Sequence, residues 1–193
     1  MNARRMEAEI VRDSLLHTAG RLDLTTGGPE LDHNAGQTNH RRSIYFRHAM
    51  EKQMLFMQIF DAANPTECYR RAETIVPQQA LALANSPLAL DMARLTAGDL
   101  AQQSGAEPTA ANNSAFINAA FTRILGRTPT DEERHACAAF LNEQAKLLAD
   151  AKSLTPFTGG GEAKVPPSPD PHQRARENLV HVLLNHNDFV TVR

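Results

Sequence analysis

The sequence predicts a mainly α-helical domain, a bundle-like arrangement of about six helices with long loops, with or without one short strand or hairpin. Hydrophobic residues make up 41% of the 193 residues and charged residues 22%, which is typical of a globular chain. Aromatic residues make up only 5% and Trp is absent, so the core has to be built mainly from aliphatic side chains, a mixture that suits helix packing. The length fits a single domain over residues 1–193.

The first half of the chain contains two predicted helices separated by irregular segments. Apolar residues recur at three-to-four spacing over residues 3–19, while charged residues, Arg12 among them, occupy the other face of that helix. Residues 25–40 carry glycines and polar groups without periodicity and predict a long loop. Residues 41–48 alternate between apolar and polar side chains, which favours a short strand, although an extended loop fits as well. A row of Met, Leu and Phe at helical spacing then predicts a helix over residues 50–60.

Capping signals define the helices of the second half. Pro77 opens one helix, and Pro87 opens the next, which reaches about residue 103. An amphipathic helix over residues 116–125 is stopped by Gly126. Thr130 and Glu133 form a capping box that opens a helix continuing to about residue 151.

The last part of the chain combines a breaker-rich segment with one more helix. Residues 153–171 hold consecutive glycines and several prolines, so we predict a flexible excursion from the domain. Asp170 and Pro171 then provide the cap and first turn of a final helix. Its apolar face predicts that it packs back on the body of the domain.

Charge and hydropathy exclude two classes of partner. Lys and Arg number 20 against 22 Asp and Glu, a formal net charge of −2, so no strong field attracts a polyanion and nucleic acid is not an expected partner. No stretch reaches the roughly 18 apolar residues that a membrane span needs. Cys68 and Cys137 lie in no CxxC or CxxCH context, so no haem or other cofactor is expected in this chain.

Three segments of the chain carry a resemblance to a known family. They are ARRMEAEIVRDSLLHTAGRLD at residues 3–23, RRSIYFRH with FDAANPTECYRRAETIVPQQALALANSPLAL within residues 41–90, and ENLVHVLLNHNDFVTVR at residues 177–193. In order and spacing they resemble the planctomycete-specific domain of unknown function that lies C-terminal to planctomycete cytochrome-c-like domains. The LGRTPTDEE stretch at residues 125–133 also fits a helix–turn–helix junction of that family.

The resemblance implies a setting without an established activity. It implies that the chain is similar to the C-terminal two-thirds of the family domain, and that the parent protein is exported and periplasmic. Haem is implied only for an associated domain. If the preceding third of the domain contributes to the core, this chain is expected to expose apolar surface.

No catalytic motif is visible. Histidine and cysteine side chains are the candidates for a metal site and for a nucleophile. His33, His40 and His48 are weak candidates for a metal site around the long loop, because no paired short His spacing supports one. Cys68 precedes two arginines, and nearby cations can lower the pKa of a thiol. A nucleophilic Cys also needs a base, and the sequence places none beside Cys68. We therefore favour the interpretation that Cys68 is a buried structural residue.

A group of Arg, Gln and Asn residues is the main candidate for ligand binding. Its members are Arg41, Arg42, Arg70, Arg71, Gln78, Gln79 and Asn85. Guanidinium and amide groups bind carboxylates or sugars. The alternative, which we favour, is that these arginines pair with internal carboxylates such as Asp61, Glu67 and Glu73 and hold loops against helices.

Three functions follow from these observations. The first is a non-catalytic helical accessory module that contacts other domains or subunits of a larger exported, cytochrome-c-linked protein. The second is a component that binds or processes polysaccharides through the Arg, Gln and Asn group. The third is metal binding through the loop histidines.

Overall fold

The computed structural model describes residues 4–67, 71–150, 152, 154 and 163–192. Seven α-helices lie within these described residues, which confirms the predicted mainly α class. They are α1 (Ala8–Thr18), α2 (Leu55–Ile59), α3 (Pro77–Asn85), α4 (Pro87–Ser104), α5 (Ala110–Leu125), α6 (Asp131–Ala149) and α7 (Pro171–Leu184). Three 3-10 turns, η1 (His33–Gln37), η2 (Ser43–Tyr45) and η3 (Asn187–Phe189), and two strands, β1 (Arg4–Arg5) and β2 (Thr191–Val192), complete the order.

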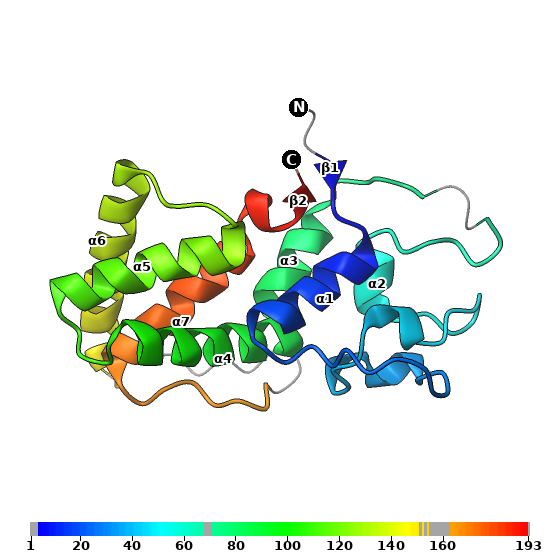
Figure 1. Cartoon of the computed structure of the whole chain (residues 1–193), viewed down its shortest axis with the longest axis horizontal. Coiled ribbons are helices and arrows are strands. Elements are labelled where there is room, and N and C mark those ends of the chain that lie inside the picture. Colours follow the sequence, from blue (N-terminus) through cyan, green and yellow to red (C-terminus); the bar gives the residue numbers. More distant parts are fainter. Residues whose placement is uncertain (1–3, 68–70, 151, 153, 155–162, 193) are drawn as a thin grey trace.

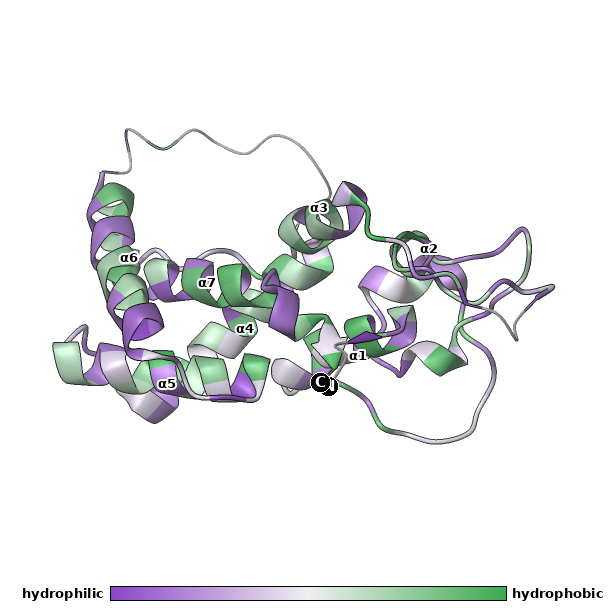
Figure 2. Cartoon of the chain, turned by 90° about the horizontal axis from the view of Figure 1, so that it is seen from above, coloured by the Kyte–Doolittle hydropathy of each residue, from purple (hydrophilic) through white to green (hydrophobic). Residues whose placement is uncertain are grey.

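The helices pack around one continuous apolar core (Figure 1). The larger half consists of α4 to α7. In it, α7 packs against α4 and α6, and α5 packs against α4 and α6. In the smaller half, α1 packs against α2 and η2, and its contact with α4 joins the two halves. Figure 2 shows α6 at one end of the molecule and the irregular segments around α2 at the other. No helix in the described part of the chain is long and apolar enough to cross a membrane.

The strand predicted at residues 41–48 is wrong, and so is the early start of the helix predicted at residues 50–60. Residues 43–45 form η2, and α2 begins only at Leu55. The two-stranded sheet lies elsewhere: β1 pairs antiparallel with β2, with Arg4 opposite Val192 and Arg5 opposite Thr191. This pairing joins segments from opposite ends of the sequence, and it also explains why the first helix begins at Ala8.

The irregular segment between η1 and η2 is organised by Arg12 of α1. The sequence places Arg12 on the polar face of this helix, and that assignment is wrong, because its side chain is fully buried. The guanidinium donates to the carbonyls of Gly36 (2.9 and 3.2 Å), Asn39 (2.5 Å) and Arg41 (3.0 Å). It also lies 4.7 Å from the centre of the Phe46 ring. Burial lowers the pKa of Arg12 to about 10, so the group stays charged at neutral pH.

A second buried arginine does the same for the α4–α5 connection. Arg176 of α7 donates to the carbonyl of Gly105 (3.1 Å) and to the side chain of Asn113 (3.0 Å). Its guanidinium lies 5.1 Å from the centre of the Phe116 ring. The loop between α4 and α5 is therefore held by a donor from a helix far along the chain.

The described part of the predicted excursion is anchored to the helical body. Residues 155–162 lie outside the described residues. Beyond them, the carboxylate of Asp91 accepts hydrogen bonds from the main-chain nitrogens of Lys164 (3.1 Å) and Val165 (2.8 Å). Glu177 accepts two from the main-chain nitrogen of Ser168 (3.1 and 3.2 Å). Burial raises the pKa of Glu177, since it disfavours the charged form.

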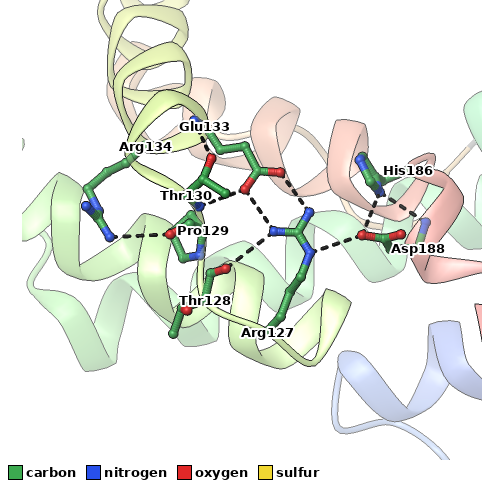
Figure 3. Close-up of polar contacts among 8 residues, drawn as sticks. All are labelled: Arg127, Thr128, Pro129, Thr130, Glu133, Arg134, His186 and Asp188. Carbon is green, nitrogen blue, oxygen red and sulfur yellow. Dashed lines mark hydrogen bonds and ion pairs between the residues drawn. The ribbon is translucent and has the colours of Figure 1, made fainter. Parts of the chain in front are cut away.

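The corner between α5 and α6 confirms the predicted capping box (Figure 3). Glu133 accepts from the Thr130 nitrogen (2.8 Å) and the Thr130 hydroxyl accepts from the Glu133 nitrogen (3.2 Å). Arg127 donates two hydrogen bonds to Glu133 (2.7 and 2.8 Å) and one to Asp188 (3.0 Å). The corner is thereby tied to η3, which follows α7. The hydrogen bonds from Arg127, with that from Thr130, lower the pKa of Glu133 to about 2.

We predict that Arg12→Met destabilises the domain strongly. The change leaves several buried carbonyls without donors, and the free energy of unfolding in urea should fall by about 3 kcal/mol or more. Arg21→Met is the matched control: this arginine is exposed just beyond α1, and its change should cost less than about 0.5 kcal/mol. Equal losses in the two variants would contradict the role of Arg12.

We also predict a pH-dependent contribution from Glu133. Its pKa in the folded protein lies below its ordinary value of 4.5, so its stabilisation is present above pH 4.5 and is lost as the pH falls toward 2. The difference in unfolding free energy between wild type and Glu133→Gln should therefore shrink across this range. Glu132→Gln, one residue away on an exposed position, should give a small difference that does not change with pH. A pH-independent difference for Glu133→Gln would show that Glu133 is not the responsible group.

Candidate functional site

The first two arginines of the predicted ligand-binding group are used inside the protein. Arg41 donates to the carbonyls of Thr25 (3.1 Å) and Gly27 (2.6 Å) and lies 3.9 Å from the centre of the Tyr45 ring. Arg42 pairs with Asp13 at 3.6 Å. Both arginines therefore stabilise the irregular segments around η1 and η2.

The remaining members of that group are divided among different places. Arg71 pairs with Glu9 of α1 (2.7 Å). Gln79 is buried and donates to the carbonyls of Ile59 (2.9 Å) and Thr74 (3.2 Å). Gln78 and Asn85 are exposed on α3. Arg70, like Cys68, lies outside the described residues.

The histidines proposed for a metal site have different surroundings. His33 lies 3.3 Å from Asp32, and His48 bonds the carbonyl of Ala63. Burial, together with nearby Arg12, lowers the pKa of His40. Among the described residues, no three His, Cys, Asp or Glu side chains come together as a group that could hold a metal ion.

An open cavity of about 450 Å³ lies where distant segments of the chain meet; we call it the junction cavity. The segment Glu73–Val76 and the first turns of α3 form one side, and β1, η3 and β2 form the other. Its lining residues are Arg5, Phe60, Glu73, Thr74, Ile75, Val76, Gln79, Ala80, Leu83, Asn185, Asn187, Val190 and Thr191. Most of the exposed lining is apolar. In Figure 1 this is the region beside β1 and β2, where the chain leads into α3.

The carboxylate of Asp61, which lines a small neighbouring pocket, holds together segments that line the junction cavity. Asp61 follows α2 and has a left-handed backbone with φ 59°, while the Ala62 nitrogen bonds the Met57 carbonyl (3.0 Å), as at a helix C-terminus. Its carboxylate accepts from the nitrogen and the hydroxyl of Thr74 (both 2.8 Å) and from Arg5 (3.4 Å). Arg5 also donates to the Thr74 carbonyl. One side chain thus connects α2, β1 and the segment before α3.

The described polar side chains that line the junction cavity are one arginine, one glutamate, two threonines and three amides. Among the described lining residues, Arg5 is the only cation, and its Nη2 atom is buried without a hydrogen-bond partner. Asn185 donates to the His181 carbonyl (2.9 Å). Asn187 is exposed at the cavity and its side chain makes no hydrogen bond among the described residues.

Ligand binding by the predicted Arg, Gln and Asn group stays a prediction. Of its described members, Gln79 lines the junction cavity and Arg71 lines a small neighbouring one. Arg5, Asn185 and Asn187 also line the junction cavity and were not among the predicted residues. The available signal was that all three lie in the opening and closing segments that carry the family resemblance, and these segments meet the central one at this cavity.

A family model matches residues 1–141, and its description is "PSD1: Protein of unknown function (DUF1553)". The chain belongs to this family. The match covers β1 to the first half of α6, including the segment before α3 and the Asp61 contacts. The closing segment, which contributes Asn185, Asn187 and β2, lies beyond the matched residues. No curated protein and no solved structure matches the chain.

We predict that Asp61→Gly loosens the segment before α3, which lines the junction cavity. Glycine tolerates the left-handed backbone, so the change removes the carboxylate contacts without adding strain. Hydrogen exchange of the Thr74 amide should accelerate about tenfold or more. Asp61→Asn, which keeps an acceptor oxygen, should give a smaller acceleration. Unchanged Thr74 exchange in Asp61→Gly would contradict this role.

Proposed function

We propose that the chain is a non-catalytic helical accessory module that binds an apolar segment of a partner domain or subunit in the junction cavity. The observation that carries this proposal is the apolar wall of the cavity, which continues onto exposed side chains at its mouth. Ile75 is 94% exposed and Val76 is 37% exposed, directly before α3. Cavities of several hundred Å³ with mainly apolar walls are typical of binding sites.

The charged side chains around the cavity are paired within the chain, which supports a mainly apolar contact with the partner. Arg5 pairs with Asp61 at 3.4 Å, and Glu73 pairs with Arg4 at the same distance. Arg71, close by, pairs with Glu9. Because the charges are matched within the chain, most of the contact area left to a partner is apolar.

Polysaccharide binding receives less support from this geometry. A sugar face usually packs on an exposed aromatic ring, and the aromatic residue at the junction cavity, Phe60, is 2% exposed. The proposed Arg41 and Arg42 contacts are also already used inside the protein. Metal binding would require the loop histidines to come together.

The larger setting of the module is the one implied by the resemblance. In this proposal the partner is another domain or subunit of an exported, periplasmic protein with cytochrome-c-like regions. Any haem would belong to those regions. The role of this chain is to hold a partner segment, and no reaction is assigned to it.

A cavity-blocking variant tests the proposal. A library of random short peptides is selected for binding to the full chain, and the selected peptides are then measured on Ala80→Trp. Ala80 is an exposed residue of α3 that lines the cavity, so Trp should fill the cavity without disturbing the core. Affinity should fall about tenfold or more.

The matched control is Gln78→Trp, which places the same side chain on the same helix away from the junction cavity. Its effect should be less than about twofold. Selected peptides should also be rich in apolar residues. If no peptide binds, or if both variants weaken binding equally, the junction cavity is not the partner site.

A further inference from the structure

Resting on the proposed function, we infer that the partner segment bound in the junction cavity is a protein C-terminus, whose carboxylate is held by Arg5 and the amides of Asn185 and Asn187. A carboxylate is an acceptor-only group and requires several donors. The lining includes both donor side chains and apolar surface. This combination fits a chain that ends in apolar residues and a free carboxylate.

The donors come from two elements that face the same cavity. Arg5 lies on β1, and its Nη2 has no acceptor within the described residues. Asn187 opens η3, and its amide makes no hydrogen bond within them. Asn185 uses one N–H on the His181 carbonyl at 2.9 Å and keeps a second N–H for a ligand.

The restraints on Arg5 allow it to serve a ligand. Its Nη2 is covered by neighbouring atoms, so a ligand oxygen reaches it when the guanidinium turns toward the cavity. Such a turn gives up the hydrogen bond from Arg5 to the Thr74 carbonyl and the long ion pair with Asp61, at 3.4 Å. Asp61 retains the shorter bonds from Thr74. Guanidinium–carboxylate pairing with two parallel hydrogen bonds then becomes available.

The unused hydrogen-bonding capacity favours an anionic end over a cationic one. Glu73 is the only acidic side chain among the described lining residues, and Arg4 pairs with it at 3.4 Å. Arg5 is the only basic one, and beyond its ion pair with Asp61 it has an unused donor. The capacity that remains for a ligand is therefore a hydrogen-bond donor, which an anionic acceptor satisfies.

The apolar walls select a peptide terminus over a uronate sugar. Ile75, Val76 and Val190 surround the cavity, with Ala80 and Leu83 from α3. An apolar final side chain buries surface against these residues, whereas a uronate presents hydroxyl groups to them at a cost. We therefore expect the ligand to be a peptide chain that ends in Leu, Val or Phe.

The test compares ligands that differ only in their final group. Short N-acetylated peptides ending in Leu, Val or Phe are prepared with a free carboxylate or with a carboxamide. Binding to the full chain is followed by calorimetry and by the NMR signals of the Asn185 and Asn187 side-chain amides. The free acids should bind at least about tenfold more tightly than the amides and should shift those signals.

Two variants locate the carboxylate. Asn187→Asp places a negative charge at an exposed position, so it should weaken the acids about tenfold and the amides less than about twofold. Arg5→Gln should abolish the preference for acids; its thermal unfolding is measured alongside, since Arg5 also contacts Asp61. Ala80→Trp should weaken acids and amides alike.

The outcomes separate this inference from the proposed function. Equal binding of acids and amides, with both lost in Ala80→Trp, would overturn the carboxylate site and leave the partner site intact. An acid preference that survives Asn187→Asp would also overturn it. If neither form binds, both proposals fail. If an oligouronate binds more tightly than any peptide acid, the ligand is a glycan and the inferred C-terminus is wrong.

Discussion

The buried guanidinium of Arg12 is the interaction on which the smaller half of the protein depends. Residues 36–46 have no sheet or long helix to satisfy their main-chain carbonyls, and buried carbonyls without donors are costly. Arg12 supplies a planar set of donors that reaches three of these carbonyls at once. A Lys could not do so, because its donors diverge from a single atom. Burying a charge is tolerated here only because nearly every donor is used.

The same arrangement recurs at the other end of the molecule, where Arg176 satisfies the loop between α4 and α5. In both cases a helix contributes one arginine to an irregular segment far away in sequence, and an aromatic ring covers the guanidinium. The helices therefore supply most of the apolar core, while single charged side chains hold the loops by hydrogen bonds. The junction cavity follows this rule as well, since Asp61 and Arg5 fix the segment before α3.

Sequence patterns predicted the helices well because their signals are local. The break between α3 and α4 at Pro87, the stop at Gly126 and the capping box at Thr130 each depend on neighbouring residues only. The pairing of β1 with β2 depends on residues at opposite ends of the sequence, and no local pattern contains it. Residues 41–48 alternate like a strand, yet within the described residues they make only isolated bridges and turn instead around the donors of Arg12.

The residues that line the junction cavity were predicted only in part for the same reason. Composition suggested Arg with Gln and Asn as ligand-binding residues, but it could not say which arginines have carboxylates or carbonyls nearby. Gln79 was identified because it lies inside a family-like stretch next to a helix start. Arg5, Asn185 and Asn187 come together only once β1 and β2 pair. Their proximity is a property of the assembled fold.

The use of arginines as internal donors also limits what this protein can bind. Arg41, Arg42 and Arg71 direct their guanidinium groups at carbonyls and carboxylates of the chain itself. A polyanion would have to compete with these short intramolecular contacts, and the net charge of −2 offers no compensating field. Donor capacity that is both unused and next to an apolar cavity is found at Arg5 and the neighbouring amides. A ligand with one anionic group and an apolar body matches these few donors and the apolar cavity better than a ligand with many charges.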